Sequence, residues 1–156
     1  MAVLDLLLIM ACLGSGMMAG LFVSFSTFMM TALGSLEDSN GIRVMQAINR
    51  HIVRPSFLMV FLGTAAALLA ASYLSYGTSE FVFIILATLV YVFACVLSTI
   101  IFNVPLNDRL ADCDPEHLES QRFWRDYLVH WTRWNHLRSV ACVVSILILA
   151  LTLLGR

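Results

Sequence analysis

FVFIILATLVYVFACVLSTIIF, residues 81–102, contains no charged side chain. An α-helix needs about 20 apolar residues to cross the roughly 30 Å hydrocarbon core of a bilayer, and this stretch has that length. It is the clearest transmembrane helix in the chain. Thr88, Tyr91, Cys95 and Thr99 follow one another at helical spacing, so we expect their side chains to form a stripe that faces other helices.

Three further apolar runs accompany it, at about residues 5–31, 55–76 and 135–154. The first is longer than the hydrocarbon core, so it should tilt or project. It lacks the basic residues that open a cleavable signal peptide, which favours a retained span. The purely apolar part of the last run, 139–154, falls short of about 20 residues, so we expect that span to begin near Asn135.

Composition agrees with a membrane protein, because 60% of the residues are hydrophobic, 12% are charged and the mean hydropathy is +0.89. A soluble domain of 156 residues cannot bury that much apolar surface. The cations are all arginine and form no basic tail, which argues against nucleic-acid binding. The sequence predicts an all-α, integral membrane four-helix bundle, one domain over residues 1–156, with helical segments at the cytoplasmic interface.

The arginines predict the orientation of the bundle. Two of the loops carry them: Arg43, Arg50 and Arg54 lie between the first two spans, and Arg109, Arg122, Arg125 and Arg133 lie between the last two. The positive-inside rule places these loops in the cytoplasm and both termini on the other side, although Arg156 is then on the unfavoured side. We expect a bacterial inner membrane location.

Two helix ends are indicated by prolines. Asn103 and Pro105 should end the third span. Asp114 and Pro115 suit the N-cap and first position of a helix. Neither glycine nor proline follows before Gly155, so residues 115–154 are either one long helix or an interfacial helix that bends into the fourth span.

With this topology, polar residues from distant parts of the chain lie near the cytoplasmic end of the bundle: Gln46 and Asn49, Asn103 and Asn107, and Asn135 and Arg138. Trp131, Asn135 and Arg138 share one helical face. Each has an ordinary alternative role, since arginine snorkels, tryptophan anchors at interfaces and asparagine caps helices. Together they predict one polar pocket with apolar walls, because buried carboxamides and a buried arginine need partners.

Neither cysteines nor histidines form a spaced ligand set. The cysteines show no CxxC spacing, and those at positions 12, 95 and 142 lie in apolar runs, so we interpret them as buried small hydrophobes. His51 and His136 belong to different loops. The sequence predicts no metal and no tightly bound flavin or haem, unless distant histidines meet in the fold.

Four stretches carry a resemblance to a known family: GLFVSFSTFMM (20–30), MQAINR (45–50), IFNVPLND (101–108) and FWRDYLVHWTRWNHLR (123–138). In these the chain resembles the anthrone oxygenase family of membrane proteins. The resemblance implies oxidation of an anthrone to an anthraquinone by dioxygen without an evident cofactor. The family motif falls on Asn49, Asn103, Pro105, Asn107, Trp131, Asn135 and Arg138.

That chemistry needs a base, oxyanion donors and an apolar slot. We expect His136, with His51 as the alternative, to be the base, and Arg138, Asn135 and Asn103 to be the donors. The expected substrate-binding residues are Asn49, Gln46, Asn107, Trp131 and Trp134. The partners are then a hydrophobic aromatic substrate, dioxygen and the lipid bilayer.

Two other functions stay open. The pocket would also suit a non-catalytic module that binds a quinone, a lipid or haem. The first span carries small residues along one face, at Gly16, Gly20, Ser24, Thr27 and Thr31, where another helix can approach closely. Such a face suits a homo-oligomer or a structural subunit of a larger membrane complex.

Overall fold

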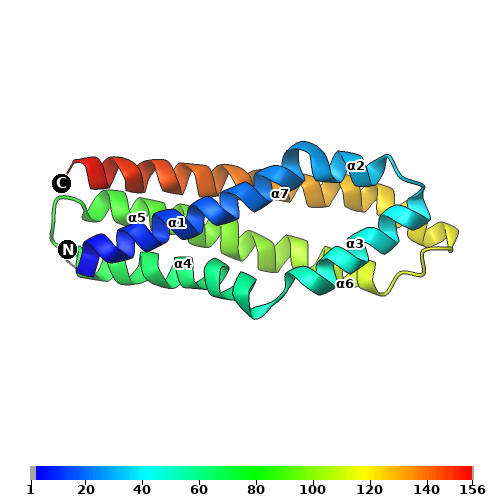
Figure 1. Ribbon diagram of the computed structural model, residues 1–156, viewed down its shortest axis with the longest axis horizontal. Coiled ribbons are helices and arrows are strands. Elements are labelled where there is room, and N and C mark those ends of the chain that lie inside the picture. Colours follow the sequence, from blue (N-terminus) through cyan, green and yellow to red (C-terminus); the bar gives the residue numbers. More distant parts are fainter. Residues whose placement is uncertain (1–2, 156) are drawn as a thin grey trace.

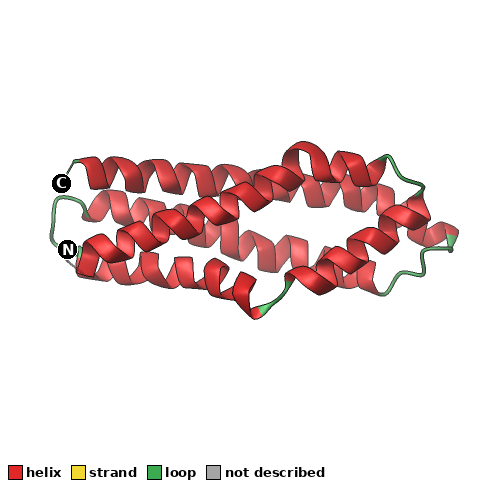
Figure 2. Cartoon of the chain, in the orientation of Figure 1, coloured by secondary structure: helices red, strands yellow, loops and turns green. Residues whose placement is uncertain are grey.

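The computed structural model describes residues 3–155, and all regular secondary structure in this range is helical (Figure 2). Four helices are long and apolar enough to cross a membrane, and they lie along one another in an elongated bundle (Figure 1): Val3–Gly34, Pro55–Leu74, Phe81–Ala111 and Leu118–Leu154. The predicted all-α bundle is confirmed, and the chain is an integral membrane protein. Which side of the membrane each end faces stays a prediction.

Two of these helices, the first and the third, are divided into shorter elements, and a further helix connects the first to the second. The first consists of α1 (Val3–Ser24), a π-helical segment (Phe25–Met29) and α2 (Met30–Gly34). The connecting helix α3 (Asp38–Ile52) leads to α4 (Pro55–Leu74). The third consists of α5 (Phe81–Leu89), two π-helical segments (Val90–Leu97 and Thr99–Asn103) and α6 (Val104–Ala111). The fourth is α7 (Leu118–Leu154).

The helices pack as a ring, in which α1 and α5 each contact both α4 and α7. Leu8, Leu68, Ile84 and Leu149, one from each helix, are fully buried in its centre. The side chains of Thr88, Tyr91 and Cys95 are also buried, and Thr99 is half-buried. The stripe predicted on the third span therefore faces the bundle interior, as expected.

The third helix does not end at Asn103 and Pro105, which corrects the sequence-based expectation. Just before the proline the helix widens, and the N–H of Val104 donates to the carbonyl of Thr99, five residues back. Pro105 then stands in the first turn of α6, where a missing N–H does no harm. The helix continues to Ala111.

The fourth helix is one continuous element of 37 residues. It begins at Leu118 and not at Pro115, because Asp114 closes a separate turn in which its Oδ1 accepts from the N–H of Glu116 at 3.0 Å. At 1.5 Å per residue, α7 is about 55 Å long, well beyond a hydrocarbon core of about 30 Å. Its first part therefore extends past the membrane.

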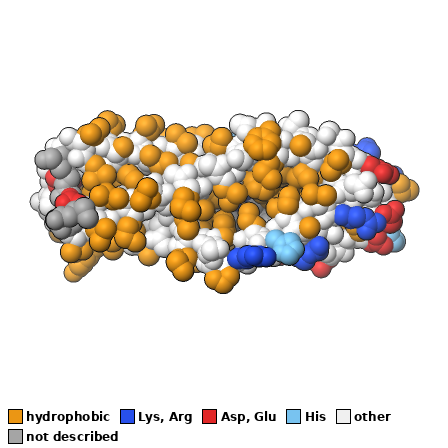
Figure 3. All heavy atoms as spheres, in the orientation of Figure 1, with side chains coloured by type: hydrophobic (Ala, Val, Ile, Leu, Met, Phe, Trp, Pro, Cys, Tyr) orange, Lys and Arg blue, Asp and Glu red, His pale blue; other side chains and the backbone are white. Residues whose placement is uncertain are grey.

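Helix α3 packs over this extended part. Its Ile42 and Met45 are fully buried against a second hydrophobic cluster that includes Trp124 and Tyr127 of α7. At its first turn Asp38 accepts from Arg125 of α7 at 2.9 Å. Arginines, histidines and carboxylates gather at this end of the molecule, whereas apolar side chains cover most of the remaining face (Figure 3). We call it the charged end.

Two further side chains of α3 attach it to the turn after α6. Arg43 pairs with Glu116, and the Nε2 of Gln46 donates to the carbonyls of Leu110 and Cys113, both at 2.9 Å. Gln46 therefore attaches α3 both to the end of α6 and to the turn that follows it.

The small-residue face of the first span is open at its two glycines. Gly16 and Gly20 are exposed, and a Cβ atom added to either would find no neighbour within 4 Å. The close approach occurs instead at Gly14, where an added Cβ would lie 1.9 Å from Oγ1 of Thr64 on α4. Whether the exposed face binds a second protein stays untested.

Gly41 of α3 gives a prediction about the attachment of α3 to α7. A Cβ there would lie 2.9 Å from the ring of Trp124, so Gly41→Ala should lower the free energy of unfolding by about 1–3 kcal/mol through overpacking. The thermal unfolding midpoint in detergent measures this. Gly16→Ala is the control, because its space is open and helix propensity then favours alanine by about 1 kcal/mol. Equal shifts in the two variants would contradict the packing argument.

Candidate functional site

A cavity of about 250 Å³ lies where α3 meets α4, with α1, the third helix and α7 as its other walls. This volume is just below the roughly 300–1,000 Å³ typical of ligand pockets, which suits a small rigid molecule. Most of the wall is apolar. The aromatic residues of the wall are Phe22, Phe25, Phe57, Phe61 and Trp131, and the polar ones are Asn49, Thr99, Asn107 and Arg138.

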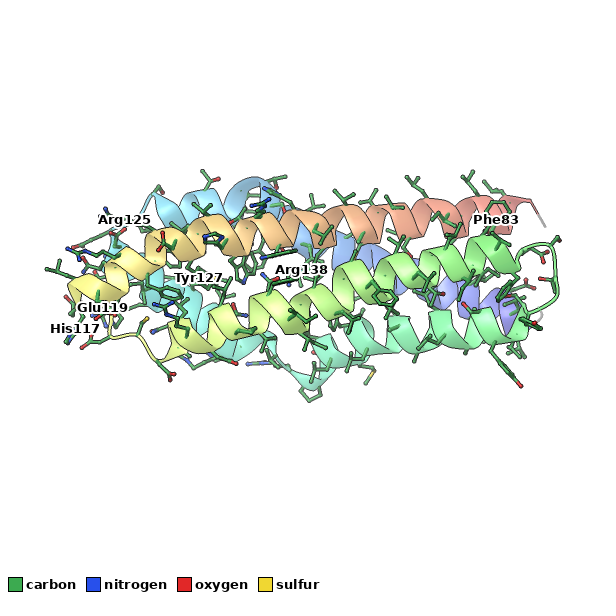
Figure 4. All side chains as sticks on the ribbon, turned by 180° about the vertical axis from the view of Figure 1, so that it is seen from behind. Phe83, His117, Glu119, Arg125, Tyr127 and Arg138 are labelled. Carbon is green, nitrogen blue, oxygen red and sulfur yellow. The ribbon has the colours of Figure 1, made fainter. Side chains whose placement is uncertain are left out.

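Arg138 is the charged residue of this wall, and only 4% of it is exposed. Its side chain points from α7 into the space between the helices (Figure 4). The guanidinium carbon lies 4.5 Å from the ring centre of Phe22 and 5.0 Å from that of Trp131. Aromatic faces at such distances attract a cation, so both rings stabilise the guanidinium.

The hydrogen bonds of Arg138 leave part of its donor capacity unused. Its Nη2 donates to Oδ1 of Asn135 at 3.0 Å and its Nη1 to the hydroxyl of Thr99 at 3.4 Å. Its Nε is buried and has no partner. A guanidinium carries five N–H donors, so a ligand oxygen in the cavity would find donors ready to bind it.

No carboxylate neutralises this guanidinium among the ion pairs of residues 3–155. Those pairs join Arg43 to Glu116, His117 to Asp114 and Arg125 to Asp38, and all lie toward the charged end. A buried charge without a counter-charge is strongly unfavourable. The site therefore favours a ligand that carries, or develops, negative charge on an oxygen.

Asn135 positions Arg138 by accepting its hydrogen bond, and it is itself fully buried outside the cavity wall. Its amide nitrogen donates to the carbonyl of Phe22 at 2.6 Å and to the hydroxyl of Ser26 at 2.7 Å, and Ser26 in turn contacts the hydroxyl of Ser139 at 3.0 Å. Its N–H groups are thus directed to the first helix and not to the cavity. The geometry makes Asn135 a support for Arg138 and not a donor to a ligand.

A second set of hydrogen bonds centres on Asn107. Its Oδ1 accepts from the hydroxyl of Tyr127 at 2.8 Å and from the indole nitrogen of Trp131 at 2.9 Å. Asn49 donates to the same tyrosine hydroxyl at 3.5 Å. Asn103 donates to the carbonyl of Trp131 at 3.3 Å, and its buried Oδ1 has no partner.

The pocket residues therefore form two networks and not the single one that the sequence suggested. Both include residues of α7, and they meet at Trp131, which bonds to Asn107 and Asn103 and places its ring against Arg138. The convergence of Asn49, Asn107, Trp131 and Arg138 on one cavity agrees with the expectation from helical spacing.

The histidines do not lie at this site. His136 is exposed and lies in a groove on another side of α7 with Arg133, and His51 is exposed on α3 with its Nδ1 3.5 Å from Arg54. Neither lines the cavity, so their expected place beside Arg138 is wrong. One residue along a helix turns by about 100°, which carries His136 away from the face of Asn135.

Two predicted substrate-binding residues also lie elsewhere. The ring of Trp134 stacks on Phe102 with centroids 3.6 Å apart. Gln46 donates instead to the backbone carbonyls of Leu110, at the end of α6, and Cys113, just after it. Neither lines the cavity.

The sequence interpretation missed several residues of the site, among them all four phenylalanines of the wall and Thr99. Phe22 and Phe61 supply aromatic wall, and Tyr127 links Asn49 to Asn107. Tyr127 stands four residues before Trp131, so the helical face already identified on α7 contained the signal for it. The two phenylalanines lie in apolar runs that offer no such signal.

No group of three metal-ligating side chains occurs within the described part of the chain. Cys95 and Cys142 are buried with their sulfurs 3.6 Å apart, and all four cysteines are free. The burial of this pair agrees with its interpretation as apolar core. The expected lack of a bound cofactor stays a prediction.

Comparisons with known proteins gave one family. A family model described as anthrone oxygenase matches residues 45–148, which is more than half of the chain and includes Asn49, Asn107, Trp131 and Arg138. The chain has no match among curated proteins or among solved structures.

Proposed function

The chain belongs to the anthrone oxygenase family, and from this we propose that it is a membrane oxygenase that converts a flat, anthrone-type aromatic ketone to a quinone with dioxygen. No tightly bound cofactor takes part. The observation that carries the proposal is the buried, unpaired guanidinium of Arg138 in a cavity with aromatic walls. The aromatic side chains suit a tricyclic ring system, and the cation suits the oxyanion that forms on it.

The reaction begins with loss of a proton from the methylene carbon opposite the ketone. The resulting enolate places negative charge on the ketone oxygen, where Arg138 stabilises it. The enolate passes one electron to dioxygen, and the carbon radical and superoxide combine to form a C–O bond. The peroxide takes up the proton, and cleavage of its O–O bond and of the remaining C–H bond releases water and leaves the second carbonyl.

The protein contributes to the first step through electrostatics and not through a dedicated base. Neither histidine nor a carboxylate is among the residues that line the cavity. A cation fixed beside a developing oxyanion lowers the barrier to proton loss without changing position during the reaction. Water is then the proton acceptor, and the same proton returns to the peroxide.

The test is oxygen stoichiometry with the purified protein in lipid vesicles. Anthrone under ¹⁸O₂ should consume one dioxygen per substrate and place one ¹⁸O atom in the new carbonyl and the other in water, at a rate well above that in protein-free vesicles. Mass spectrometry of the quinone measures the label. Vesicles containing Arg138→Ala protein control for spontaneous oxidation at a protein surface. Tight binding of the quinone without acceleration would favour a non-catalytic quinone-binding module.

A further inference from the structure

We infer that the cavity receives its substrate from the bilayer, as the uncharged ketone, through a lateral opening between α4 and the Ile100–Val104 segment of the third helix. The inference builds on the proposed function, because it specifies how the substrate of that same site arrives and in which form.

The opening is defined by residues that line the cavity and are exposed on the outside of the bundle. On α4 these are Leu58 and Leu62, with 39% and 48% of their surface exposed, and Val53, just before α4, is 60% exposed. On the third helix they are Ile100 and Val104, with 53% and 40% exposed. All of these side chains are apolar, and all except Val53 lie on helices that cross the membrane. The surface at which the cavity opens therefore faces lipid.

The route from the charged end is closed by packing. Met45 of α3 and Tyr127 of α7 are fully buried between the cavity and that end, and Trp124 fills the space beneath Gly41. The bonds of Gln46 to Leu110 and Cys113 attach α3 to the turn after α6. A molecule arriving from water at the charged end would have to separate α3 from α7.

The depth of the opening follows from the start of α4. This helix begins at Pro55, so Leu58 lies in its first turn and the opening lies in the leaflet nearest the charged end. Arg50 and Arg54 are exposed just before this turn. Arginines in such a position extend toward lipid headgroups, which holds the opening just below them in the hydrocarbon region.

This geometry defines the chemical form of the substrate. Moving a charged molecule into the hydrocarbon region costs several kcal/mol, on the order of the cost for a charged side chain. An uncharged aromatic ketone dissolves there. Once inside, the same molecule meets the guanidinium of Arg138, which favours its ionised form. Ionisation therefore follows entry, and analogues with a permanent sulfonate should not enter.

The experiment uses the fluorescence of Trp131, a residue of the cavity wall. Trp124→Phe and Trp134→Phe leave it as the single tryptophan of the chain. Phospholipids with brominated acyl chains should quench this emission strongly, and acrylamide in the water should quench it weakly. Because Trp124→Phe loosens the packing at the charged end, quenching by brominated lipid is the deciding measurement. Weak quenching by these lipids would overturn the inference. The measurement needs no turnover, so failure of the proposed enzymatic function and failure of lateral entry are distinguishable.

Substitutions at the opening show whether brominated acyl chains reach Trp131 through the opening or quench it only because the helix lies near lipid. Leu58→Phe on α4 and Ile100→Phe on the third helix, each added to the single-tryptophan protein, should narrow the opening and at least halve the quenching by brominated lipid. Leu69→Phe is the matched control, because Leu69 is exposed on α4 but does not line the cavity. Unchanged quenching in both Leu58→Phe and Ile100→Phe would overturn the inference, even if one of the two folded poorly.

Discussion

Arg138→Ala should lower kcat/KM for anthrone oxidation by about 10²-fold or more, by analogy with removal of an oxyanion-hole donor. The side chain is the buried cation of the cavity wall, so its loss removes the charge that stabilises the enolate. The fold should tolerate the change, since removing a buried cation that has no carboxylate partner leaves no opposite charge unpaired. Quinone formation followed by absorbance, together with the unfolding midpoint, measures both effects.

Two further arginine variants make this prediction specific. Arg138→Lys should recover only part of the activity, because an ammonium can neither stack between Phe22 and Trp131 nor replace the planar fork that reaches Asn135 and Thr99. Arg133→Ala on the exposed side of the same helix should retain full activity. Full activity of Arg138→Lys would mean that a positive charge at this position is sufficient and that the planar guanidinium is not required.

Asn135→Leu should lower kcat by up to about 10²-fold with a smaller effect on KM, because a catalytic group that shifts by about 1 Å can lose that much. Leucine keeps the volume but removes the acceptor for Arg138 and the two bonds to the first helix. The buried carbonyl of Phe22 would then lose a donor, at a cost of about 1–3 kcal/mol in stability. Steady-state kinetics and thermal unfolding measure the two effects separately.

A charged replacement at the same position tests whether catalysis depends on the uncompensated charge of Arg138. The Asn135→Asp substitution keeps a hydrogen-bond acceptor for Arg138. It also places a negatively charged carboxylate directly beside the guanidinium. The pair would be neutral, so stabilisation of the substrate oxyanion should fall even though the arginine is still present. If Asn135→Asp were as active as the unaltered protein, catalysis would not depend on the uncompensated positive charge of Arg138.

The four-helix architecture was predictable because hydropathy depends on composition over many residues. The four spans and the buried stripe at Thr88, Tyr91 and Cys95 follow from such averages. The helix ends near Pro105 and Pro115 did not follow. At both places a local hydrogen bond determines where the helix begins or continues. The bond runs from Val104 to Thr99 in one case and from Glu116 to Asp114 in the other. Such bonds cannot be inferred from composition.

The site was predictable in part, for a similar reason. Trp131, Asn135 and Arg138 share a helical face, and the structure places all three at or directly behind the cavity. His136 was included for its chemistry although its position in the helix points away from that face. The aromatic wall from Phe22 and Phe61 depends on how α1 and α4 cross α7, which one chain without a structure does not reveal.

The π-helical segment Phe25–Met29 has a consequence for how related chains should be aligned. A widened turn of this kind holds one residue more than an α-helical turn. A relative that lacks this residue would cross the membrane with an ordinary α-helix there, and every later position of that helix would be rotated by about 100°. Single-residue gaps in the middle of the first or third span are therefore structurally permissible. They would distinguish members of the family that keep the bond between Asn135 and Ser26 from members whose pockets have a different shape.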